Sequence, residues 1–144
     1  MYRNIAVAFD KSSEAFRALA AGIQLAKTLG VGLQTITVME KLPEYTAFAT
    51  ATDGDVIRIL EEDRRRFYEE LQGRARAAGR AEGVEVEPHT VDGECVDSIV
   101  QFVCDQKIDL LVIGLHKRQN RLTRLWSTVY AIAQNVPCSL LGVH

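Results

Sequence analysis

The sequence predicts an α/β protein with a five-stranded, mainly parallel sheet sandwiched by four helices. Short apolar runs rich in β-branched residues alternate along the chain with longer segments whose apolar residues recur every three to four positions. The chain has 144 residues, 47% of them hydrophobic and 25% charged, and we expect a single globular domain over residues 1–144. Alternating strands and helices are typical of doubly wound folds, in which helices cover both faces of the sheet.

The first part of the chain predicts a strand, a helix and a second strand. Residues 4–9 form a short apolar run that suits a buried strand. Ser12 or Ser13 can cap the helix that follows, and Gly30 and Gly32 are expected to end it. Residues 33–39 are rich in β-branched residues and are predicted as the second strand. A unit of this kind predicts a right-handed parallel crossover.

The middle of the chain predicts a long loop, a long helix and an edge strand. Residues 40–54 have no hydrophobic period, and loops of this length are often lids or binding loops. Residues 55–80 predict a helix whose charged residues cover a solvated face. Its apolar stripe consists of Val56, Leu60, Phe67, Leu71, Ala75 and Ala78. Residues 84–91 contain Pro88, which cannot donate to a sheet ladder, so we expect this strand at an edge.

The last part of the chain predicts two further helix–strand units. A helix after residue 94 is followed by a strand at residues 108–113. A helix at residues 127–135 is followed by the final strand at residues 139–143. The buried face of the first of these helices is predicted to consist of Val96, Ile99, Val100, Val103 and Cys104.

Composition excludes several classes of partner and location. The net charge of −2 leaves no basic excess to displace phosphate counterions, so we expect no nucleic-acid partner. No apolar run approaches the roughly 20 residues of a membrane span, and the first residues run straight into a strand rather than a signal peptide. We therefore expect a cytoplasmic protein without membrane contact. The three cysteines, Cys95, Cys104 and Cys138, are widely spaced and are predicted to be buried and unpaired.

Several well-known catalytic and phosphate-binding motifs do not occur in the sequence. There is no Walker-type phosphate loop, no glycine fingerprint after the first strand and no nucleophile elbow. The three histidines, His89, His116 and His144, lack partners at metal-ligand spacing, so we predict no metal site. No nucleophile with a matched base can be named, and we predict no catalytic residue.

One stretch nevertheless has the layout of an anion site. An apolar run ends at Gly114, a basic loop follows, and Ser127 and Thr128 precede another apolar segment that begins at Val129. A strand, a loop and a helix N-terminus in this order offer backbone N–H groups to an anion at the carboxyl edge of a parallel sheet.

The sequence as a whole resembles the universal stress protein family. The opening IAVAFDKSSEA resembles the family's first strand and the start of its first helix, and the long loop and charged helix follow in the expected order. The closing DLLVIGLHKRQNRLTRLWSTVYAIAQNVPCSLLGVH resembles the last two strands of the family, with Pro-Cys before the final strand. The resemblance implies a cytoplasmic stress-response protein with strand order 3-2-1-4-5 and ATP or AMP as its ligand. Any hydrolysis of bound ATP is expected to be slow and incidental.

The resemblance also implies a set of nucleotide-binding positions. Family members that bind ATP carry G-x-x-G, nine further residues and G-[ST]. Here Lys117 and Ser127 stand in place of the second and third glycines. Asp10 corresponds to an aspartate that contacts ribose, although a turn or capping role explains it equally well. The implied positions are Ala8, Asp10, Val38, Met39, Gly114, His116, Lys117, Ser127, Thr128 and Val129.

The altered glycines leave two interpretations open. Glycine permits positive φ and close approach of a backbone to phosphate, and Lys117 and Ser127 lack that freedom. In one interpretation the charge of Lys117 replaces the lost contacts, and Ser127 and Thr128 donate from the helix N-terminus, which makes the protein a genuine ATP or AMP sensor. In the other the phosphate cradle is abandoned and Ser127 is only a helix cap. We expect weakened or lost adenine-nucleotide binding.

The last strand is predicted to form a dimer contact. Residues 139–143 are apolar and lie at a sheet edge in the implied order, and the resemblance implies a homodimer through this strand.

A response-regulator receiver would use Asp10, an acceptor near Asp92 and Lys117, but it would need paired acids where this chain has Asp10-Lys11. An enzyme of the broader adenine-nucleotide hydrolase superfamily would need a pyrophosphatase loop, which does not occur.

Overall fold

All five strands belong to one parallel sheet. The computed structural model describes residues 1–39, 41, 54–116 and 128–144. The strand order is β3-β2-β1-β4-β5, and all four neighbouring pairs are parallel. The prediction of a parallel α/β sheet in the order 3-2-1-4-5 is confirmed, as is the edge position of the strand that contains Pro88. From edge to edge the strands are β3 (Val86–Asp92), β2 (Leu33–Met39), β1 (Ile5–Ala8), β4 (Leu110–Gly114) and β5 (Ser139–Val143).

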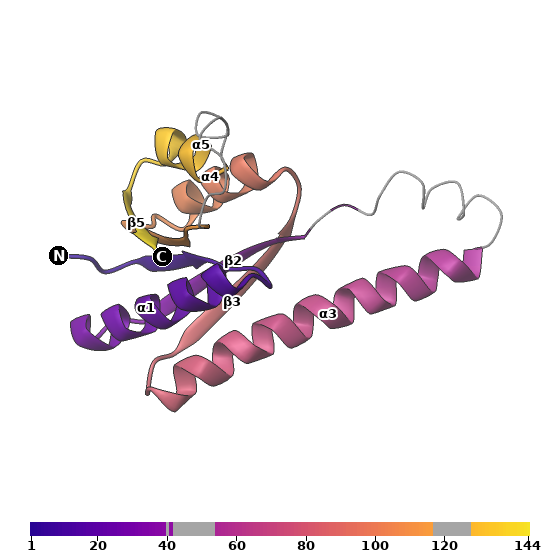
Figure 1. Ribbon diagram of the computed structural model, residues 1–144, viewed down its shortest axis with the longest axis horizontal. Coiled ribbons are helices and arrows are strands. Elements are labelled where there is room, and N and C mark those ends of the chain that lie inside the picture. Colours follow the sequence, from indigo (N-terminus) through magenta and orange to yellow (C-terminus); the bar gives the residue numbers. More distant parts are fainter. Residues whose placement is uncertain (40, 42–53, 117–127) are drawn as a thin grey trace.

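Helices cover both faces of the sheet (Figure 1). The helices α1 (Ser13–Leu29) and α3 (Gly54–Ala81) lie on one face, and α4 (Cys95–Asp105) and α5 (Thr128–Asn135) lie on the other. The central strand β1 sends Ile5 and Val7 into one apolar core and Ala6 into the other. Because both faces are buried, the inner strands read as continuous apolar runs instead of alternating ones.

The first helix begins and ends where the sequence predicts. The Ser12 hydroxyl accepts a hydrogen bond from the backbone N–H of Ala15 at 3.1 Å, which caps the N-terminus of α1. At the other end Gly30 adopts a left-handed conformation with φ of 67°. These two caps fix the length of the helix and the position of the turn that precedes it.

The helix α3 is longer than the sheet that it covers. Its 28 residues span about 42 Å, whereas a seven-residue strand spans about 23 Å. Only Leu71, Ala75 and Gly79, in its C-terminal half, are buried, and the N-terminal half extends past the strands in Figure 1. Within the predicted apolar stripe, Leu71 and Ala75 are therefore buried, whereas Phe67 is 43% exposed. Among the described residues, no helix is both long and apolar enough to cross a membrane.

The predicted burial of the cysteines is wrong for two of the three. Both Cys95 and Cys104 are exposed, Cys138 is half-buried, and none of the three forms a disulfide with another described residue. The buried face of α4 consists of Ile99, Phe102 and Val103, so Phe102 occupies the place that the sequence assigned to Cys104. The larger ring turns toward the sheet, where it packs against His89 with ring centroids 5.0 Å apart.

Candidate functional site

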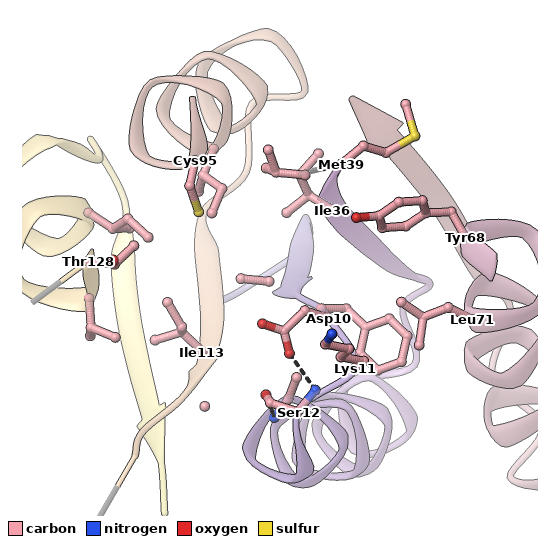
Figure 2. Close-up of a pocket in the computed structure, with 18 of the residues that line it drawn as sticks. Asp10, Lys11, Ser12, Ile36, Met39, Tyr68, Leu71, Cys95, Ile113 and Thr128 are labelled. Atoms are coloured by element: carbon pink, nitrogen blue, oxygen red, sulfur yellow. Dashed lines mark hydrogen bonds between the residues drawn. The ribbon is translucent and has the colours of Figure 1, made fainter. Parts of the chain in front are cut away.

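A cavity of about 1120 Å³ lies at the carboxyl edge of the sheet, where β1, β2 and β4 end (Figure 2). The sequence order of the strands reverses between β1 and β4, and clefts at such reversals are the usual ligand sites of open α/β sheets. In Figure 2, Asp10, Ile36 and Ile113 surround the centre of the cavity, with Thr128 on one side and Tyr68 and Leu71 on the other.

Eight of the ten predicted nucleotide-binding positions line this cavity. Six of them lie at or just after the ends of β1, β2 and β4, which the parallel sheet brings to the same edge. The remaining two, Thr128 and Val129, are at the start of α5. The other two of the ten, Lys117 and Ser127, lie outside the described residues. The eight are Ala8, Asp10, Val38, Met39, Gly114, His116, Thr128 and Val129.

The backbone before Asp10 is fixed from both sides. The backbone N–H of Phe9 donates to the Ile36 carbonyl at 2.9 Å, and the fully buried Thr37 hydroxyl donates to the Phe9 carbonyl at 2.8 Å. Asp10 then accepts the backbone N–H of Ser12 through Oδ1 at 2.7 Å. Its second carboxylate oxygen has no partner among the described residues. Asp10 therefore serves the turn with one oxygen, and the residue lines the cavity.

The glycine that is retained from the family motif has a packing role. A Cβ atom on Gly114 would lie 2.5 Å from the backbone carbon and oxygen of Glu14, in the first turn of α1. Gly114 is not among the glycines with positive φ, so it provides space and not an unusual backbone conformation. The close approach of α1 to the end of β4 thus requires glycine at this position whether or not phosphate binds.

A carboxylate and an imidazole meet beside Gly114. His116 Nδ1 lies 3.3 Å from Glu14 Oε2, and the Glu14 side chain is much the less exposed of the two. The pKa of Glu14 is lowered, chiefly by a hydrogen bond from its own backbone N–H, while burial opposes this and His116 adds to it. The N-terminus of α1 therefore favours the negative charge of Glu14, and the imidazole of His116 lies next to this carboxylate.

A second lowered glutamate pKa predicts acid-sensitive stability. Glu94 caps α4 by accepting the backbone N–H of Asp97 at 2.9 Å. This hydrogen bond, followed by those of Val96 and Cys95, lowers the pKa of Glu94 below its ordinary value of 4.5, while burial opposes the shift. The contribution of ionised Glu94 to the stability of the folded state is fully present above pH 4.5. It is lost as the pH falls through the lowered pKa of Glu94 in the folded state.

We expect the free energy of unfolding of Glu94→Gln to fall less steeply than that of the wild type as the pH drops below 4.5. Urea unfolding at several pH values on both sides of 4.5 measures this slope. Glu61→Gln, on the exposed face of α3, is the matched control. Equal slopes for the wild type and Glu94→Gln would contradict the capping role.

Positively charged side chains line the cavity together with the carboxylate of Asp10. Among the described residues these are Lys11, Lys41 and Arg64, and the imidazole of His116 lines it as well. Within the described part of the chain, no three or more His, Cys, Asp and Glu side chains gather in a way that could hold a metal ion. The cavity thus combines apolar walls, one carboxylate and several cations, which suits an organic ligand that carries hydroxyl and anionic groups.

A model of the universal stress protein family matches residues 1–144. The chain belongs to this family. The strand order agrees, and it differs from the order 2-1-3-4-5 of flavodoxin-like receivers, in which β1 lies between β2 and β3. The receiver alternative is therefore wrong.

Solved structures of universal stress proteins share the fold. A universal stress protein in complex with cAMP is 24% identical, with a TM-score of 0.75 over 99% of this chain and 97% of that one. The Archaeoglobus fulgidus protein is 24% identical, with a TM-score of 0.70 over 100% of both chains. Its complex with dAMP is 23% identical, with a TM-score of 0.68 over 99% of this chain and 98% of that one. No curated protein sequence matches the chain.

The sequence of this universal stress protein did not reveal one wall of the cavity. Phe67 and Leu71 were predicted only as members of an apolar stripe, and Arg64 as part of a solvated helix face, yet all three line the cavity together with Tyr68. Cys95, at the start of α4, also lines it. The only local signal is the spacing of the four α3 residues, which places them on one helix face. That spacing does not say whether the face meets a core or a cavity.

Proposed function

We propose that this chain is a regulatory protein of the stress response, which binds the nucleoside part of an adenine nucleotide in the cavity and holds the phosphates weakly. The supporting observation is the open carboxylate of Asp10 between apolar walls at the carboxyl edge of the sheet. A nucleoside presents a planar apolar face and ribose hydroxyls, and a carboxylate accepts hydrogen bonds from such hydroxyls. Complexes of similar proteins with cAMP and dAMP support adenine nucleotides as the ligand class.

Weak binding of phosphate follows from the altered motif. Of its three glycines only Gly114 is retained, and the packing of α1 accounts for that one. Thr128 still begins α5 beside the cavity, so its end of the helix offers backbone N–H groups to an anion. The alternative is a full ATP sensor in which Lys117 and the Ser127–Thr128 helix start bind the phosphates. A much tighter affinity for ATP than for adenosine would favour that alternative.

Calorimetric titration with adenosine, AMP and ATP tests the proposal. We expect all three to bind, with affinities within about tenfold of one another, because the nucleoside supplies most of the contacts. Asp10→Ala should weaken each of them about tenfold or more, the usual effect of losing a hydrogen bond to a charged group.

Asp63→Ala is the matched control, because this exposed aspartate lies on α3 and does not line the cavity. It should leave all three affinities unchanged. The absence of binding heat for all three ligands at millimolar concentration would overturn the proposed function.

We also propose that the protein is a homodimer that pairs through β5. The backbone N–H of Ser139 donates to Asp109 at 3.2 Å, and Val143 accepts from Leu115 at 2.7 Å, so alternate residues of β5 face inward. The backbone groups of Leu140 and Gly142 then face the open edge of the sheet. Leu141 is 39% exposed on this strand. Pairing with a second copy would satisfy the open edge and cover this side chain.

A further inference from the structure

One face of α3 forms a wall of the cavity. Arg64, Phe67, Tyr68 and Leu71 follow one another at intervals of three, one and three residues, so they share a single face of the helix. Figure 2 shows Tyr68 beside Met39 and Leu71 on the same side of the cavity, across from Ile113 and Thr128. None of these α3 residues belongs to the nucleotide-binding positions that the sequence motif supplies.

This wall is anchored at both ends. Leu71 is only 3% exposed and belongs to the apolar core beneath the sheet. One turn before the aromatic pair, Arg64 Nη2 lies 2.9 Å from Asp92 Oδ1, which ties α3 to the last residue of β3. The helix is thus held across the carboxyl edge of the sheet. Side chains between two such anchors are already in place when a ligand arrives, so they lose little conformational entropy when it binds.

An aromatic side chain remains exposed between these anchors. Phe67 is 43% exposed, although Leu71, one turn later, is in the core. Its ring meets Tyr68 edge to face, with centroids 5.2 Å apart and an interplanar angle of 82°. A planar group of a ligand in the cavity would remove apolar surface of this pair from water, and heteroaromatic rings stack well on such platforms.

We propose that Phe67 and Tyr68 form an aromatic subsite that takes the planar group of the ligand. Only the identity of the planar group rests on the proposed function, under which it is the adenine ring. The wall itself selects for planar, apolar chemistry, and phosphate does not contribute to this selection. The α3 face and Asp10 therefore determine together which class of ligand the cavity takes. Asp10 accepts hydrogen bonds from the hydroxyl groups of the ligand.

Two probes and three variants test this subsite. The probes are AMP and anilinonaphthalene sulfonate, a fluorophore that has a planar naphthalene ring and no nucleoside. Phe67→Ala removes the exposed ring, Phe67→Trp retains a planar face, and Ile59→Ala is the control. Ile59 is 52% exposed on the same helix and does not line the cavity. Circular dichroism establishes that each variant is folded before titration.

We expect Phe67→Ala to weaken the binding of both probes about tenfold, as the loss of one stacking platform does. Phe67→Trp should bind at least as tightly as the wild type, Ile59→Ala should bind like the wild type, and AMP should displace the fluorophore. Unchanged affinities in Phe67→Ala, or equal losses in Phe67→Ala and Ile59→Ala, would overturn the subsite. If the fluorophore binds through Phe67 but AMP does not bind to the wild type, the proposed function fails and the aromatic subsite stands.

Discussion

Gly114→Ala is expected to lower the free energy of unfolding by about 1–3 kcal/mol, the usual range for overpacking a close contact. The added methyl group would lie 2.5 Å from backbone atoms of Glu14, and a helix backbone cannot turn aside as a side chain can. The first turn of α1 must therefore move away from β4. Because Asp10 and Ser12 immediately precede this turn, the movement should also weaken ligand binding. Urea unfolding and nucleotide titration of the same variant measure both effects.

Gly73→Ala separates this packing effect from the general effect of replacing glycine. Gly73 lies in the interior of α3, in its C-terminal half, and a Cβ atom there would meet nothing within 4 Å. Alanine is the better helix former, so this variant should gain about 0.5–1 kcal/mol of stability. If Gly114→Ala were as stable as the wild type, the close approach of α1 to β4 would not be the reason for glycine at this position.

Leu141→Lys is expected to shift the protein from dimer to monomer. Lysine on an edge strand opposes edge-to-edge pairing because its ammonium group must remain hydrated. Leu141 lies in the middle of β5, so two copies that pair through this strand would bring two such charges close together. We expect at least about a hundredfold increase in the dimer dissociation constant, since a buried like-charge pair costs several kcal/mol. Sedimentation equilibrium over a range of concentrations measures it.

Leu29→Lys is the matched control, because Leu29 at the end of α1 is also 39% exposed. This variant should retain the mass and the dissociation constant of the wild type. A wild-type protein that sediments as a monomer at micromolar concentration would rule out pairing through β5.

Local sequence patterns were sufficient to predict the elements of the sheet. The strands β2 and β5 occur over the predicted residues, and Ser12 and Gly30 cap α1 as expected. These features depend on neighbours in sequence: β-branched residues for strands, a hydroxyl for the first turn, and a glycine for the left-handed cap.

Features that depend on contacts between elements could not be predicted in this way. Phe67 and Leu71 belong to one apolar stripe, but only the second lies over the sheet. Cys104 and Phe102 both suit a helix–sheet contact, and the structure buries only the ring. In each case periodicity identifies a face of a helix, whereas the length and position of the sheet decide which residues of that face are covered.

The candidate site was predictable where it follows from strand ends. Asp10, Val38 and Gly114 each lie at or just after the end of a strand, so a parallel sheet necessarily gathers them at one edge. The contribution of α3 depends instead on how the helix crosses that edge, and the ion pair from Arg64 to Asp92 spans 28 residues of sequence. No local pattern encodes such a contact. The packing role of Gly114 was hidden for the same reason.

The unequal lengths of α3 and the sheet divide this helix into two regions of different mutational tolerance. Substitutions around Leu71 and Gly79 act on the core and are felt by the whole fold. Arg58 and Glu62, in the first turns, are exposed, and substitutions at exposed positions usually alter stability by less than about 0.5 kcal/mol. Natural variation can therefore change the charge and shape of this protruding segment while the sheet, the cavity and its aromatic wall stay the same.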